Sequence, residues 1–193
     1  MASQFAFLAS EFPDVHALAV KAEDMARTDA RGACFYARLA LETMVVWLYR
    51  NDRNLRSPYE TTLSARIHEP TFQALVGVPL VTKAKVVKDF GNKAAHESRN
   101  VPAGDGVATV RELFHLSYWL VRTYARGAKP PAALQFSATA LPLNTSIPAE
   151  RLDQLREAAR RFADAVKARD EAEARRRASE DERGRLEAET VSL

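Results

Sequence analysis

Helical periodicity is the feature that most constrains this chain, because apolar residues recur at steps of three and four while strand signals are nearly absent. The clearest stripe begins after Asp29, a residue type that caps helix N-termini. Its apolar positions are Ala33, Ala37, Ala40, Leu41, Met44, Val45, Leu48 and Tyr49. The pattern predicts an all-α fold, with this helix at the centre of a bundle.

The same periodicity predicts more helices in the first two thirds of the chain. The long ones cover 13–27, 79–96 and 105–126, and two shorter ones lie near 60–67 and 70–76. Gly127 is expected to end the helix over 105–126, since glycine favours the position after a helix C-terminus. The inner face of the 79–96 helix is predicted to be Leu80, Ala84, Val87, Gly91 and Ala95.

Proline divides the chain into three parts. Residues 1–127 form the predicted helical bundle, and residues 128–148 contain four prolines and little periodicity, which indicates an extended linker. Leu134, Phe136 and Leu141 are the residues expected to attach this linker to the body. Residues 149–193 predict a charged helix, with a short coiled-coil seam followed by a polar spacer. Such a helix is typical of a spacer within a longer protein.

Composition excludes several classes of function. A hydrophobic fraction of 47% supports a buried core, yet no apolar run approaches the roughly 18 residues of a membrane span. The N-terminus lacks the features of a signal peptide, and the single cysteine, Cys34, cannot form an internal disulfide. We therefore expect a cytoplasmic protein with no membrane contact. No phosphate-binding loop and no metal-ligand spacing occurs, so neither a cofactor nor a metal is expected.

One segment carries polar groups of catalytic type at a regular interval. Asn92 precedes His96 by four residues, which places an amide and an imidazole one turn apart on one helix face. A site that cleaves RNA also needs a cation to stabilise charge on the phosphate, and the residue before Asn92 is Gly91 rather than arginine. The alternative is structural: a histidine near a helix C-terminus interacts favourably with the helix dipole, and Asn92 could bridge two helices.

Other polar residues are candidates for supporting roles. Arg38 and Glu42 lie one turn apart and form either a buried polar pair facing the 79–96 helix or an exposed pair worth about 0.3–0.5 kcal/mol. A basic segment offers candidates for phosphate contacts, with a solvated helix face as the alternative. Its candidate residues are Lys85, Lys88, Lys93 and Arg99. The formal net charge of +3 is too small to argue for nucleic acid by itself.

Several segments, in order, resemble a known family. They are Phe5–Leu8, Ala33–Arg38 with Leu41 and Glu42, Trp47–Tyr49, Ile67–Pro70, Gly91–His96 and Val110–Phe114. Over about residues 1–127, with the charged tail, the chain resembles an uncharacterised domain at the N-terminus of the motor (R) subunits of type I restriction enzymes. That domain looks like a divergent member of the HEPN superfamily (higher eukaryotes and prokaryotes nucleotide-binding). The resemblance implies a HEPN-like bundle of four to five main helices.

The resemblance also implies which residues would form an active site. Active HEPN ribonucleases have an R-N-x-x-x-H arrangement, usually paired across a dimer, in which the histidine acts as acid or base and the arginine holds the phosphate. This chain keeps Asn92 and His96, but Gly91 stands at the arginine position. The resemblance therefore implies a site that lacks the phosphate-holding arginine.

Three functions follow as hypotheses. The first is a non-catalytic N-terminal module of a restriction-type DNA translocase, acting in phage defence. It would dock DNA, RNA, other restriction-system subunits or a second copy of itself as a homodimer or larger assembly. The second is a HEPN-type ribonuclease that uses His96, with a lysine in place of the missing arginine. The third is a stand-alone oligomerising or ligand-binding helical protein.

Overall fold

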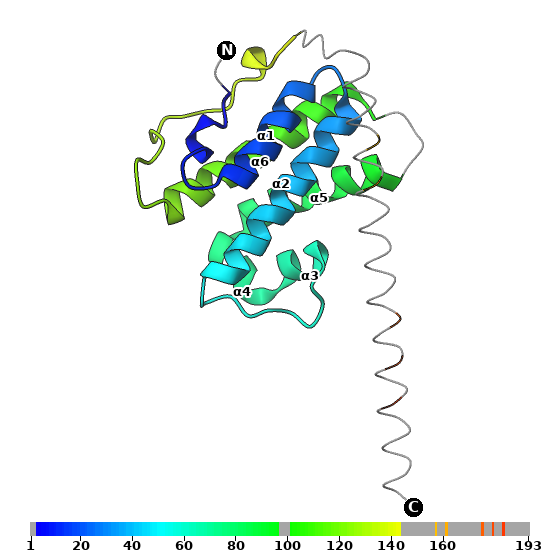
Figure 1. The fold of residues 1–193 in the computed structure, drawn as a ribbon, viewed down its shortest axis with the longest axis vertical. Coiled ribbons are helices and arrows are strands. Elements are labelled where there is room, and N and C mark those ends of the chain that lie inside the picture. Colours follow the sequence, from blue (N-terminus) through cyan, green and yellow to red (C-terminus); the bar gives the residue numbers. More distant parts are fainter. Residues whose placement is uncertain are drawn as a thin grey trace, which may run out of the picture.

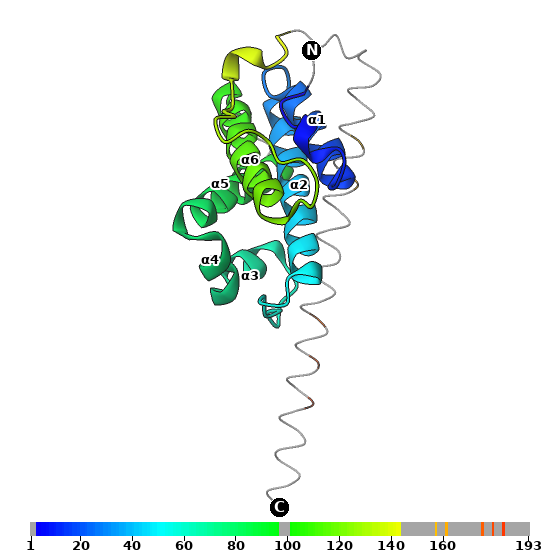
Figure 2. The ribbon, with the colours of Figure 1, turned by 90° about the vertical axis from the view of Figure 1, so that its left-hand side faces the viewer.

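Three long helices, α2 (Ala30–Asn51), α5 (Val78–His96) and α6 (Ala103–Tyr124), pack against one another, and α1 (Pro13–Met25) covers α2 (Figure 1). The computed structural model describes residues 3–96 and 101–143, together with the single positions Glu157, Arg161, Arg175, Ser179 and Arg183. Two short helices, α3 (Leu63–His68) and α4 (Pro70–Val76), lie together at the end of the bundle where α2 ends (Figure 2). The fold is all-α in the described residues.

Local sequence signals explain where these helices begin and end. The Asp29 side chain accepts a hydrogen bond from the Gly32 N–H at 3.1 Å, which confirms the predicted cap of α2. Thr62 caps α3 in the same way, and Glu69 caps α4 through the N–H groups of its first turn. Gly77 has a φ of 79°, a left-handed conformation that glycine adopts easily, and it lets the chain turn directly from α4 into α5.

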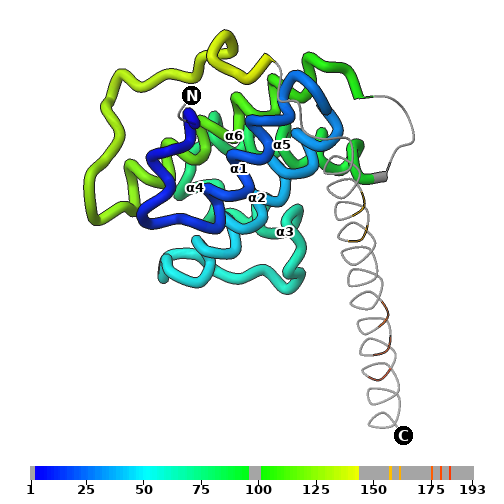
Figure 3. The backbone as a smooth tube through the Cα atoms, turned by 45° about the horizontal axis from the view of Figure 1, so that its top comes forward, coloured from blue at the N-terminus to red at the C-terminus, as the bar shows by residue number. Residues whose placement is uncertain are grey.

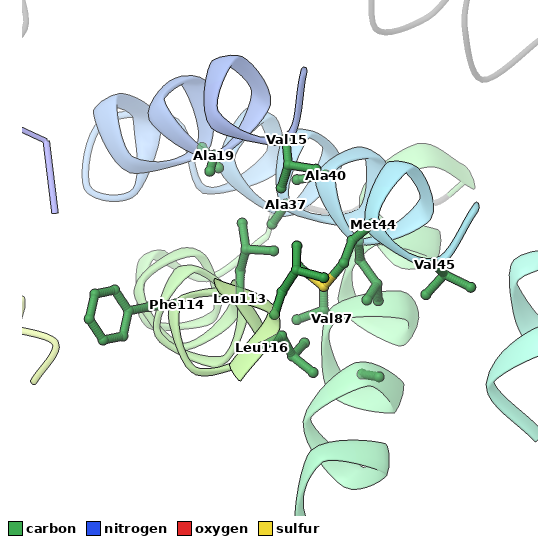
Figure 4. Close-up of a cluster of buried hydrophobic side chains, with 14 of the residues drawn as sticks. Val15, Ala19, Ala37, Ala40, Met44, Val45, Val87, Leu113, Phe114 and Leu116 are labelled. Atoms are coloured by element: carbon green, nitrogen blue, oxygen red, sulfur yellow. The ribbon is translucent and has the colours of Figure 1, made fainter. Parts of the chain in front are cut away.

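The core lies where α2 meets its three neighbours (Figure 4). Small residues on α2, Ala37 and Ala40, are fully buried and let the helix axes approach closely. Larger side chains fill the space between the helices, among them Met44 of α2, Val87 of α5 and Leu113 of α6. The predicted α2 stripe is confirmed, except that Tyr49 is only half-buried. Its hydroxyl donates to the Arg66 carbonyl at 2.8 Å, and burial raises the Tyr49 pKa to about 12.

Two details differ from the sequence-based expectation. The buried face of α5 includes Val81 and Ala94, whereas Leu80 and Ala95 are half-buried, because the stripe follows the line of contact with both α2 and α6. Gly127 does not end α6, which stops at Tyr124 with Ala125 as its cap. The Gly127 N–H instead donates to Glu11 Oε1 at 2.9 Å. The Glu11 carboxylate therefore holds the turn after α6.

Residues 128–143 form a strap along the body, and Figure 3 shows it passing the N-terminal segment. The Gln4 side-chain amide donates from Nε2 to the Ser137 carbonyl at 3.1 Å, and its Oε1 accepts from the Ser137 N–H at 2.7 Å. Leu141 is buried and Phe136 packs against the core, as expected, while Leu134 is exposed. The predicted charged helix over 149–193 lies outside the described residues apart from five single positions.

Candidate functional site

The crossing of α2 over α5 is built around Gly91. A Cβ atom added to Gly91 would lie 2.3 Å from Arg38 Cβ and 2.7 Å from Arg38 Cδ, far inside van der Waals contact. The aliphatic stem of Arg38 therefore rests directly on the α5 backbone. Any side chain at position 91 would displace it, so glycine here is required by a close approach between two helices.

The Arg38 guanidinium lies partly inside the protein. Its Nε is buried and has no hydrogen-bond partner among the described residues. The residue as a whole is half-buried, so solvent reaches part of the side chain. Glu42, one turn further along α2, is buried at 9% exposure. Both members of the polar pair suggested by the sequence thus lie on the half of α2 that packs against its neighbours.

A second arginine on α2 shows how such a side chain is normally satisfied. Arg31 lies seven residues before Arg38, and its Nη1 donates to the Ala94 carbonyl at 2.7 Å. This bond occupies one of the carbonyl groups that the last turn of α5 leaves without an intrahelical partner. Arg31 thus ties the end of α5 to α2.

The predicted amide and imidazole belong to the last turns of α5. Asn92 directly follows the glycine on which Arg38 rests, and it is half-buried. The backbone of His96 completes the helix, while its side chain lies outside the described residues, as does Arg99. The structure thus places Arg38 of α2 beside Gly91 of α5, the residue before Asn92. The spacing of residues within α5 could not predict this contact, because it joins two helices.

The candidate lysines of α5 have different surroundings. Lys85, Asp89 and Lys93 follow one face at steps of four, and exposure rises along it from the half-buried Lys85 to the exposed Asp89 and Lys93. Lys93 is exposed, with its Nζ 5.6 Å from the centre of the Phe90 ring. Lys88 is largely buried, at 15% side-chain exposure, and its Nζ lies 3.0 Å from Asp89 Oδ1. Lys85 and Lys93 are therefore the better placed of the three for contact with a partner.

The sequence reading did not identify a charged cluster between α5 and α6. Glu112 is buried and accepts from Lys83 Nζ at 2.5 Å and from Arg111 Nε at 2.9 Å. The His115 Nδ1 lies 3.3 Å from the same carboxylate. Burial favours the neutral form of Glu112, but these hydrogen bonds outweigh it and hold its pKa below the usual value. The signal in the sequence was a glutamate among the apolar positions Val110, Leu113 and Phe114, with Arg111 before it and His115 one turn later.

Other carboxylates of the body also have structural partners. Glu23 accepts from the Ser3 hydroxyl and from the Gln4 N–H, and Asp52 accepts from the Tyr124 hydroxyl at 2.6 Å. The Tyr124 bond is the largest reason that the pKa of Asp52 is lowered. These groups hold segments together. Within residues 3–96 and 101–143, no three potential metal ligands gather into a cluster, and no helix is long and apolar enough to span a bilayer.

Comparison with known proteins identifies a family. No curated protein and no solved structure matches this chain. A family model described as a domain of unknown function (DUF4145) matches residues 20–134, which is more than half of the chain. The match begins within α1, contains the α2–α5 crossing and ends in the strap. The chain therefore belongs to the DUF4145 family.

Proposed function

We propose that this chain is a non-catalytic N-terminal module of a restriction-type DNA translocase or endonuclease subunit and that it docks nucleic acid. The observation that carries the proposal is the contact between Arg38 and Gly91. Because the arginine stem fills the space beside Gly91, α5 has no room for the side chain that an R-N-x-x-x-H site would place there. The parent enzyme is inferred from the resemblance of the segments named above to such subunits.

Nucleic acid is the partner that the charges of α5 favour. The half-buried Lys85 and the exposed Lys93 lie on its outer face, and the stem of Arg38 packs against the same helix at Gly91. Phosphate contacts of this kind position a protein on nucleic acid without reading its sequence. The other carboxylates and basic groups described above are engaged within the fold, which leaves this face as the best candidate for docking.

A ribonuclease is the second candidate, and the position of Arg38 is what favours it. The contact with Gly91 places a guanidinium-bearing side chain from α2 next to the residue before Asn92. Such an arginine could hold a phosphate while His96 moves a proton. In this alternative Arg38 of α2 supplies the cation that the R-N-x-x-x-H arrangement requires, so neither Lys88 nor Lys93 has to replace the missing arginine.

The binding test uses labelled duplex DNA and single-stranded RNA with the purified chain, followed by fluorescence anisotropy at several salt concentrations. We expect binding that weakens as salt rises, and weaker binding for the double variant Lys85→Glu, Lys93→Glu. The double variant Arg50→Glu, Arg53→Glu is the matched control, because it makes the same change of charge at exposed positions at the far end of α2, and it should bind more tightly than the first double variant. Absence of any binding would remove the proposal that the module docks nucleic acid.

The cleavage test separates the two candidates. We expect neither RNA cleavage nor ATP hydrolysis by the purified chain. RNA cleavage that disappears in His96→Ala would establish the ribonuclease instead. The assignment to a restriction subunit is tested by reading the gene beyond the codon for Leu193, where a helicase and a nuclease are expected to follow.

A further inference from the structure

We propose that Arg38 forms a binding site for a phosphate group at the crossing of α2 and α5. That the natural ligand is a nucleic acid rests on the proposed function. The site itself is defined by the Arg38 side chain alone. Its stem is fixed against the Gly91 backbone, its Nε is buried, and that Nε has no hydrogen-bond partner among the described residues. A charged side chain is thus held in place while its Nε–H makes no hydrogen bond within the described residues.

The unpaired Nε–H group of Arg38 costs free energy in the folded state. Buried donors are nearly always hydrogen-bonded, because leaving one unpaired loses its hydration without replacement. A guanidinium is charged at all accessible pH values, so it cannot avoid this penalty by losing a proton. An anion that accepts from Arg38 would relieve the penalty. Arg31 shows the contrast, since the same residue type on the same helix does donate to a protein carbonyl.

The shape of the site favours a phosphate oxyanion. The planar fork of arginine presents parallel N–H groups that match two oxygens of a phosphate. Because the Arg38 stem is packed on Gly91, little side-chain freedom remains to be lost when the anion binds. Arg38 is half-buried as a residue, so solvent reaches part of its side chain although its Nε is covered.

The first experiment observes the Arg38 Nε–H directly by NMR, with its resonance assigned through its loss in Arg38→Lys. A buried N–H exchanges slowly with water and should therefore be visible at neutral pH. We expect inorganic phosphate to shift this resonance saturably at constant ionic strength, and sodium chloride to leave it unchanged. A resonance that no phosphate compound shifts would overturn the proposal, and so would an equal response to sodium acetate.

The second experiment separates the two sources of the phosphate. Adenosine monophosphate supplies a free phosphomonoester, and a short duplex DNA without terminal phosphates supplies only the backbone diester. Saturable shifts with either one support the site and identify its source. Arg38→Lys keeps a stem and a charge but loses the fork, so we expect its affinity for the active probe to fall about tenfold. Arg50→Lys, at an exposed position on the same helix, should leave the affinity unchanged.

The outcomes distinguish this inference from the proposed function. Phosphate binding at Arg38 without any affinity for nucleic acid would keep the site and remove nucleic-acid docking. Nucleic-acid binding that is equal in wild type and Arg38→Lys, with no shift of the Nε–H resonance, would keep the docking module and remove the site. Circular dichroism of Arg38→Lys checks that the helical bundle is intact in both cases.

Discussion

Lys83 of α5 and Glu112 of α6 form an ion pair in which Nζ lies 2.5 Å from Oε2. The glutamate is buried, and the lysine side chain is 29% exposed. The pair joins α5 to α6, which also pack against each other.

Replacing Lys83 with methionine should destabilise the protein by about 1–2 kcal/mol, because a buried carboxylate loses one of its charged donors. Arg111 and His115 remain beside Glu112 and limit the loss. The double variant Lys83→Met, Glu112→Leu should recover most of the stability, since no buried charge is then left. Urea unfolding of the three proteins measures this. A double variant that is less stable than Lys83→Met would contradict it.

Glu112 should also make stability depend on acid pH. Its folded-state pKa is lowered below 4.5, so its contribution is fully present above that unfolded value and is lost as the pH falls through the folded pKa. The stability difference between wild type and Glu112→Gln should therefore shrink below about pH 4.5. Urea midpoints measured across the acid range test this, and a difference that grows as the pH falls would show that the sign is wrong.

Gly91→Ala should destabilise the protein by about 1–3 kcal/mol, because the new methyl group meets the Arg38 stem and α2 must move away from α5. Adding Arg38→Ala should not restore stability, since the nearest atom is Arg38 Cβ, at 2.3 Å, and alanine keeps it. The matched control is Gly104→Ala, where a Cβ meets nothing within 4 Å and should be neutral or stabilising. Thermal unfolding of all three variants gives the comparison, and equal melting temperatures for Gly91→Ala and Gly104→Ala would refute the close approach.

Leu141→Ala should cost about 2–4 kcal/mol, because Leu141 is 2% exposed and lies within the core cluster. Leu143, two residues later, is 68% exposed, so Leu143→Ala should have little effect. Limited proteolysis should cleave residues 128–143 faster in Leu141→Ala than in Leu143→Ala. Equal rates of cleavage would mean that Leu141 does not anchor the strap.

Periodicity predicted the helices well because each has an apolar face, and Asp29 gave the start of α2 to the residue. The prediction that Gly127 ends α6 was wrong, because the helix stops at Tyr124 and Gly127 belongs to the turn that follows it. Here its backbone N–H is held by Glu11, more than a hundred residues earlier in the sequence, which no local signal can indicate.

The candidate site was predictable only within a single helix. The four-residue spacing placed Asn92 and His96 on one face of α5, and the identity of Gly91 showed that no arginine precedes Asn92. Neither could show that Arg38 occupies the space beside Gly91, since that depends on how α2 crosses α5. The pairing of Lys83 with Glu112 was invisible for the same reason.

The paired hydrogen bonds between Gln4 and Ser137 have a mechanical consequence. They join the segment before α1 to the segment after α6, so the helices lie in a loop of chain that these two bonds close. Tension applied to the chain before Gln4 or after Ser137 would first load the bond from Ser3 to Glu23 and the buried side chain of Leu141. The two bonds between Gln4 and Ser137 would open only after these anchors had given way.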